Sequence, residues 1–245
     1  MSKTTQLRVR VWDLPTRIFH WLLVTLIVCA WASFEFNDKV GDPELIWHRY
    51  NGYAISILVL WRILWGIVGS PASRFATFLT WPWNAFRYGI DLIRQRDRHY
   101  LGHNPLGSYM IIALLALVGC QAIFGLLATE HNSVTWGPLA LLLSDETSEW
   151  FGKMHGWLFE EIILVFIFLH IVANVLYRLI KKDQLIEAMV IGTKPLANYE
   201  DQTAILGEPE NAKSSKSILR ALICLALATA IFAGTIIGLG GKLFY

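Results

Sequence analysis

Five long apolar runs constrain the fold of this 245-residue chain more than any other feature. Each is close to the roughly 20 residues that an α-helix needs to cross about 30 Å of hydrocarbon. None alternates polar and apolar residues as the strands of a membrane barrel do. The runs cover residues 18–36, 48–69, 106–128, 155–180 and 218–240. The sequence therefore predicts an all-α fold, an integral membrane helical bundle with a four-helix core and a fifth C-terminal transmembrane helix.

The composition agrees with a bilayer environment. Hydrophobic residues make up 55% of the chain and charged residues 16%, and the mean hydropathy is +0.45, which is typical of a membrane protein. We expect a transmembrane core over 1–182, a cytoplasmic amphipathic segment and linker over 183–216, and the C-terminal helix over 217–245. The first run, which contains Ala30-Trp31-Ala32, could instead be a secretory signal peptide. Its His20 and the topology of the other helices favour a retained membrane helix.

The distribution of charge predicts the orientation, because basic connections stay in the cytoplasm. The basic segments contain Lys3, Arg8, Arg10 and Arg17, then Arg74, Arg87, Arg94, Arg96 and Arg98, then Arg178, Lys181 and Lys182. The acidic connections contain Glu35, Asp38, Asp42 and Glu44, then Glu130, Asp145, Glu146 and Glu149. We expect a multi-pass protein in contact with membrane lipid, its N-terminus cytoplasmic and its C-terminus on the outer side. This sidedness explains the basic residues without a nucleic-acid partner, and the net charge is only +2.

The three cysteines exclude one mode of haem attachment. Cys29, Cys120 and Cys224 each stand alone in an apolar run, so the chain has no Cys-x-x-Cys-His motif. Any haem is therefore expected to be held noncovalently.

Four histidines inside the apolar runs are the main functional signal, since an imidazole in hydrocarbon needs a partner. They are His20, His48, His155 and His170. His48 and His155 open their helices from the outer side, and His20 lies near the inner side. His170 follows His155 by 15 residues, or about 22 Å of helix. Depth therefore pairs His48 with His155 and His20 with His170.

The helical faces allow both pairs to point into one bundle. At about 100° per residue, His155 and His170 differ by only about 60° around their helix. Two imidazoles from different helices are what a six-coordinate haem iron requires, and this coordination favours electron transfer over catalysis. A zinc site is a poorer fit, because zinc prefers four ligands.

Other polar residues leave alternatives open. Arg62 could pair with a haem propionate or extend to the membrane interface. Glu160 and Glu161 could assist proton transfer or be ordinary interfacial residues. His103 and Asn104 could bind a quinone headgroup or cap the helix before Pro105. His99 and His131 fall in connections and are expected to be solvated. Gly234 and Gly238 have a small-xxx-small spacing, which leaves a homo-oligomer open.

Several motifs together resemble one protein family. They are RVRVWDLPTRIFHW at 8–21, HRYNGY at 48–53, WRILWG at 61–66, YLGHNPLG at 100–107, the pair His155 and His170, and AMVIGTK at 188–194. In this order they resemble the bacterial cytochrome b561 family, in the branch with the b-type cytochrome subunits of nickel–iron hydrogenases and the cytochromes b that partner c-type cytochromes. The resemblance spans about residues 8 to 194. His20 matches the family's haem-ligating histidine in the opening motif.

The resemblance implies two haems b and electron transfer in a bacterial inner (plasma) membrane. Electrons would pass between membrane quinone and a periplasmic redox protein, either a c-type cytochrome or a hydrogenase. The interval between His155 and His170 is one residue longer than is usual in the family, which calls for a local bulge in that helix. The fifth helix is a second departure, because the four-helix core does not require it.

Two other classes of function stay open at this point. A haem-free membrane anchor or assembly subunit would explain the helices but not the four histidines. A proton-coupled or metal-ion transporter would explain buried histidines, yet the chain lacks the internal inverted repeat often found in such proteins. The sequence also leaves open whether the chain is an enzyme in its own right or the electron-transfer subunit of a quinone-reactive oxidoreductase.

Overall fold

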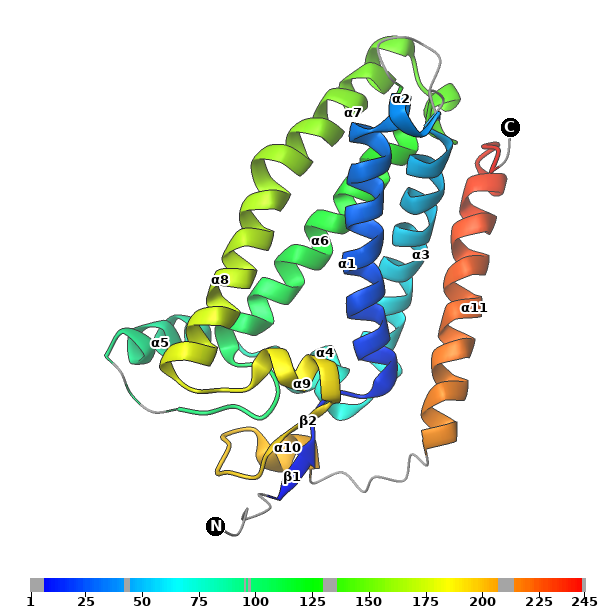
Figure 1. Cartoon of the computed structure of the whole chain (residues 1–245). Helices are drawn as coiled ribbons and strands as arrows, with labels where there is room; N and C mark the ends of the chain where they lie inside the picture. The colour runs from blue at the N-terminus through cyan, green and yellow to red at the C-terminus, as the bar shows by residue number, and fades with distance from the viewer. Residues whose placement is uncertain are drawn as a thin grey trace. The chain divides into compact units, whose positions relative to one another are not determined.

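The computed structural model describes residues 7–41, 45–94, 96, 98–129, 136–206 and 214–243. Within these ranges, five helical spans are long and apolar enough to cross a membrane. They are α1 (Leu14–Glu35), α3 (Ile46–Val68), α6 (Pro105–Leu127), the continuous span Asp145–Ile180 and α11 (Ser214–Gly238) (Figure 1). The predicted all-α membrane fold is confirmed. Lys3, Asp42, Glu44, Glu130, His131 and linker residues 207–213 lie outside the described residues.

The fourth span begins ten residues earlier than the apolar run, and it has three parts. They are α7 (Asp145–Trp157), the π-helix η3 (Leu158–Ile163) and α8 (Leu164–Ile180). Ser144 caps α7, because its Oγ accepts a hydrogen bond from the backbone N–H of Thr147. The carboxylates of Asp145 and Glu146, in the first turn, interact favourably with the positive end of the helix dipole. This polar start explains why hydropathy alone placed the beginning of the helix too late.

A π-helix holds one extra residue in a turn, and η3 lies between His155 and His170. The long histidine interval predicted a bulge at this place. The structure therefore has a local feature that accommodates the additional residue.

Shorter elements connect the spans. They are α2 (Asn37–Val40), η1 (Pro71–Ser73), α4 (Phe75–Phe78), α5 (Pro82–Ile93), η2 (Ala140–Leu142), α9 (Leu185–Ile191) and α10 (Gln202–Leu206), with the strands β1 (Arg8–Arg10) and β2 (Thr193–Pro195). The two strands are antiparallel, with Val9 opposite Lys194. Neither the strands nor α5 was expected from the sequence.

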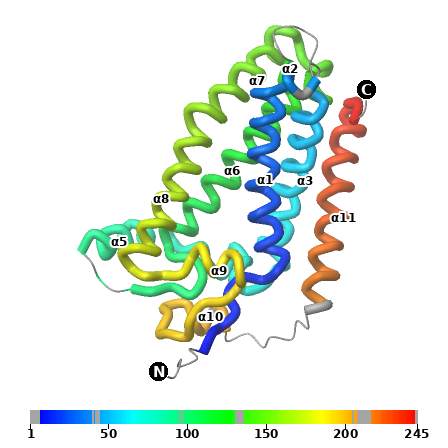
Figure 2. The backbone as a smooth tube through the Cα atoms, in the orientation of Figure 1, coloured from blue at the N-terminus to red at the C-terminus, as the bar shows by residue number. Residues whose placement is uncertain are grey.

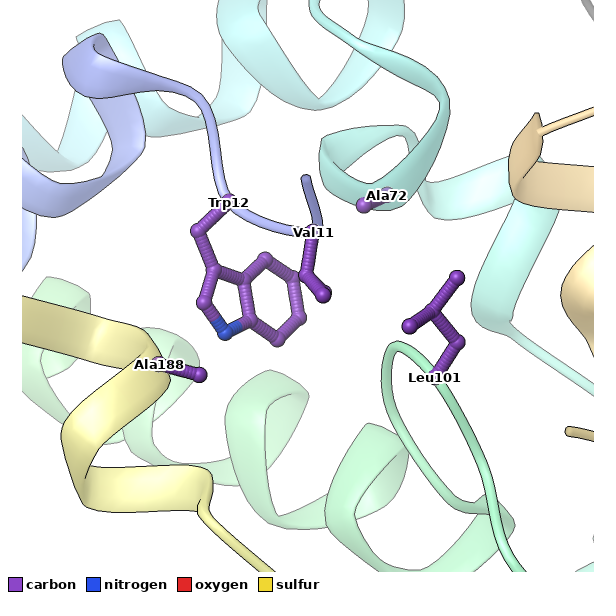
Figure 3. Close-up of a cluster of buried hydrophobic side chains, with 5 residues drawn as sticks. All are labelled: Val11, Trp12, Ala72, Leu101 and Ala188. Atoms are coloured by element: carbon purple, nitrogen blue, oxygen red, sulfur yellow. The ribbon is translucent and has the colours of Figure 1, made fainter. Parts of the chain in front are cut away.

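The chain divides into two compact units. Unit 1 comprises 1–18, 64–113 and 169–221, and unit 2 comprises 19–63, 114–168 and 222–245. In unit 1 a cluster of buried side chains joins four separate segments, as Figure 3 shows: Val11, Trp12, Ala72, Leu101 and Ala188. Gly192 ends α9 with φ +85°, which glycine adopts without strain, and its carbonyl oxygen accepts from the backbone N–H groups of Val11 and Trp12. The segments that follow α8 are thus bound to the N-terminal arm.

Unit 2 has its own apolar core. Leu23, Leu26, Ile27 and Ala30 of α1 pack against a buried cluster of Ile55, Val59 and Val118 from α3 and α6. A second cluster unites α3 and α11 with the segment that follows α6. The packing in this unit positions the candidate site.

Lys194 is the most unusual buried residue of unit 1. Its side chain is 0% exposed, and Nζ lies 2.9 Å from Asp183 Oδ1 and 3.1 Å from the carbonyl oxygen of Tyr100. Burial lowers the pKa of the Lys194 ammonium, and the Asp183 carboxylate opposes this shift. The pair therefore joins β2 to the segment after α8 and to the connection before α6.

We expect Lys194→Ala to destabilise the protein by about 3–5 kcal/mol, because it leaves the Asp183 carboxylate without its buried cation. The melting temperature in detergent measures this effect. Arg96→Ala is the matched control: Arg96 pairs with Asp91 at 3.0 Å but is 63% exposed, so its loss should cost less than about 1 kcal/mol. Equal melting temperatures for the two variants would contradict a structural role for the Lys194 pair.

Candidate functional site

Two of the predicted histidines lie close together in unit 2. His48 is in the first turn of α3, and His155 is in the last turn of α7. The centres of their rings are 6.0 Å apart, and the ring planes cross at 85°. Their predicted depths in the membrane paired these two residues, and the structure brings them together. Their role as haem ligands stays a prediction.

The same kind of hydrogen bond orients both imidazoles. His48 Nδ1 lies 2.8 Å from the carbonyl oxygen of Ala30, and His155 Nδ1 lies 2.9 Å from the carbonyl oxygen of Gln121. A carbonyl oxygen can only accept, so each Nδ1 carries the proton and donates it. This tautomer puts the lone pair on Nε2, the atom that can bind a metal.

A cavity of ≈ 310 Å³ adjoins both rings, and small residues from several helices line it. A Cβ atom built on Gly52 or Gly156 would meet no atom within 4 Å, so a side chain there would project into open space. At Gly125 the same atom would lie 2.9 Å from His155 Cε1. Glycine at this position therefore lets the His155 ring lie directly against α6.

These residues fit a haem held by two imidazoles. His48 and His155 would hold it through their Nε2 atoms, since both Nδ1 atoms already donate to backbone carbonyl oxygens. Arg49 also lines the cavity, and its guanidinium suits a propionate. Among the described residues, no group of three or more His, Cys, Asp or Glu side chains could hold a metal ion.

The other candidate ligands occupy different units. His20 lies in α1 within unit 2, with its ring centre 4.9 Å from that of Trp21. His170 lies in α8 within unit 1, where Asn174 Nδ2 is 3.4 Å from its Nε2. Arg62 lies in α3 and is 4% exposed. The pairing of His20 with His170 stays a prediction, as does the role of Arg62.

The structure supports a helix-capping role for Asn104. Its Oδ1 accepts a hydrogen bond of 2.8 Å from the backbone N–H of Gly107, which caps α6. His103 packs between Trp12 and Phe78, with ring centres 4.4 and 4.7 Å away. The His103 ring is therefore packed against aromatic side chains of unit 1.

Glu160 and Glu161 lie on η3, and both are exposed. Only Glu160 is among the residues that line the cavity. The two carboxylates are therefore not equivalent, although the sequence alone does not distinguish them.

Sequence reasoning missed several residues of the cavity. Arg49 directly follows His48, and Gln121 is a polar residue within an otherwise apolar helix, which was a usable signal. Gln121 Nε2 donates to the carbonyl oxygen of His155 at 3.0 Å. Its Oε1 is buried and has no hydrogen-bond partner within the part of the chain that the structure describes. The glycines carried no usable signal, because glycine is common in membrane helices.

Comparison with known proteins gives a consistent result. The family model of prokaryotic cytochrome b561 matches residues 11–192. A "Probable Ni/Fe-hydrogenase B-type cytochrome subunit" of Rhizobium leguminosarum bv. viciae is 22% identical over 232 residues, covering 79% of this chain and 91% of the relative. A protein of Azotobacter vinelandii with the same name is 26% identical over 223 residues, covering 76% of this chain and 88% of the relative.

A similar relative occurs in Escherichia coli. This "Probable Ni/Fe-hydrogenase 1 B-type cytochrome subunit" is 24% identical over 216 residues, covering 74% of the chain and 88% of the relative. No solved structure matches the chain.

Proposed function

This chain belongs to the prokaryotic cytochrome b561 family, and on that premise we propose that it carries electrons through two haems b between membrane quinone and a redox partner. The family and the five apolar helical spans make it a multi-pass membrane cytochrome b that functions in electron transfer. The number of haems, the quinone and the partner are parts of the proposal.

The observation that carries the proposal is the arrangement of His48 and His155. Their ring centres lie 6.0 Å apart beside a cavity with small lining residues, and both Nδ1 atoms donate to backbone carbonyl oxygens. A haem bound between them would supply reversible one-electron chemistry. The carbonyl groups of Ala30 and Gln121 would fix the tautomer and the orientation of both rings, and the apolar walls would exclude water. His20 and His170 would hold a second haem, with Arg62 as the partner of a propionate.

The relatives' names favour a hydrogenase as the partner, and a c-type cytochrome is the second candidate. We propose that the partner docks on the outer side, where the exposed Asp145 and Glu146 begin α7. The distribution of Lys and Arg supports an inner-membrane protein with a cytoplasmic N-terminus and a periplasmic C-terminus.

The haem content of the purified protein tests the proposal. We expect a pyridine haemochrome spectrum of haem b and two haems per chain in detergent. His48→Ala and His155→Ala should lose one haem, and His20→Ala and His170→Ala should lose the other, because each substitution removes one axial ligand. His99→Ala, a histidine in a connection, is the control and should keep both haems.

An apoprotein that cannot be reconstituted with haem would overturn the proposal. The anchor and transporter hypotheses would then be separated by measuring proton and metal-ion flux in vesicles. Loss of the same haem from all four variants would contradict the two-site arrangement alone.

A further inference from the structure

The C-terminal half of α11 packs against the walls of the candidate haem cavity. Its buried residues Cys224, Ala228, Phe232 and Ile236 recur every four positions, which places them along one face of the helix. Phe232 and Ile236 join Tyr53 and Leu139 in one cluster. Figure 2 shows this part of α11, in red, beside α3.

The first cavity-lining residue that α11 contacts is Tyr53. The ring centres of Tyr53 and Phe232 are 5.4 Å apart, a separation at which aromatic rings attract one another. Tyr53 lines the cavity together with His48 and Gly52 of the same helix. Phe232 therefore supports a residue that would itself border the haem.

The second part of the cavity lining that α11 contacts is the segment that follows α6. Trp136, Gly137 and Pro138 line the cavity, and backbone hydrogen bonds from Gly137 to Ala128 (2.8 Å) and from Leu139 to Leu126 (3.0 Å) hold this segment against α6. A Cβ atom on Gly241, just after α11, would lie 2.5 Å from the carbonyl oxygen of Pro138. Gly241 thus lies directly against the same segment.

Outside this buried stripe, Leu227, Ile231 and Ile237 of α11 are exposed. The family match ends at residue 192, whereas α11 begins at Ser214. The helix is therefore an addition to the matched region, and its buried stripe ends on two elements that line the cavity.

We infer that α11 is a positioning element of the haem site, which holds Tyr53 and the 136–139 segment in place through Phe232 and Ile236. This inference rests on the proposed function. When a packed ring is removed, its neighbours relax only in part and leave a cavity. The walls would then move, and the bound haem would be held less tightly.

The test compares two double variants of the full-length protein. Phe232→Ala with Ile236→Ala removes the contact with Tyr53 and Leu139. Leu227→Ala with Ile231→Ala removes similar apolar volume from the exposed face. We expect the first pair to release one of the two haems roughly tenfold faster to an acceptor apoprotein and to shift the midpoint potential of that haem. The control pair should match the unmodified protein in both measurements.

A milder variant covers the case in which the first pair does not fold. Phe232→Leu keeps an apolar side chain but lacks the aromatic ring, and we expect both haems to remain while the midpoint potential of one shifts. Unchanged release and potential in the Phe232 variants, or equal changes in the control pair, would overturn the inference. A wild-type protein without haem would instead overturn the proposed function, so the two failures are distinguishable.

Discussion

Replacing Gly52 with leucine is expected to remove the haem held by His48 and His155 while the helices stay folded. Gly52 lies one turn after His48 and lines the cavity, and a Cβ atom there meets nothing within 4 Å. The fold therefore has room for the new side chain, but that side chain takes space that the haem needs. Overpacking a core typically costs roughly 1–3 kcal/mol. A penalty of that size on haem binding would lower the affinity for haem by about tenfold or more. The haem-to-protein ratio should fall from two to one.

The control for this variant is Gly234→Leu in α11. A Cβ atom on Gly234 also meets nothing within 4 Å, but Gly234 is not among the residues that line the cavity. Both proteins should have the helical content of the unmodified chain, and Gly234→Leu should also keep its melting temperature and both haems. If Gly52→Leu retained two haems with unchanged midpoint potentials, the space beside Gly52 would not be the haem site.

The membrane spans were predictable because hydropathy and length act within a single helix. Four of the five spans agree with the apolar runs to within about four residues at either end. The exception is the fourth span, where α7 begins with polar turns that extend beyond the apolar run. In that region the capping group of Ser144, rather than hydropathy, marks the beginning of the helix.

The fold of unit 1 depends on contacts that are distant in sequence. Asp201 accepts hydrogen bonds from the backbone N–H groups of Leu101 and Gly102, and Lys194 reaches the carbonyl oxygen of Tyr100. No local pattern in either segment identifies the other. The strand pair β1–β2 was not predicted either. Each strand has only three residues, which are too few for a period-two alternation to be informative.

The candidate site was predictable in part. The predicted order and sidedness of the membrane helices paired His48 with His155, because both residues begin apolar runs that start on the outer side. The orientation of the rings was not predictable, since the hydrogen bonds to Ala30 and Gln121 depend on how α1 and α6 pack against them. The role of Gly125 also requires the structure, because only the position of His155 shows that a Cβ atom would collide with the ring.

Inserting an alanine after Ile162 in η3 is expected to remove the haem bound through His170 and to leave the haem between His48 and His155. The π-helix already accommodates one residue more than an α-helical turn. With a second extra residue, the helix beyond η3 would rotate by about 100° and shift by about 1.5 Å. His155 precedes η3 and keeps its hydrogen bond to Gln121, whereas His170 follows η3 and would leave the face that it shares with His155.

The matched control is deletion of Ile162, which removes the extra residue and lets η3 become an α-helical turn. It should retain two haems, because the register of His170 does not change. Redox titration followed by absorbance should show one component in the insertion variant and two in the control, and the component that remains should be the one that His48→Ala removes. Two haems in the insertion variant would mean that the length of η3 does not set the orientation of His170. Loss of one haem from the deletion variant as well would show that the packing around Ile162, and not the helical register, causes the effect.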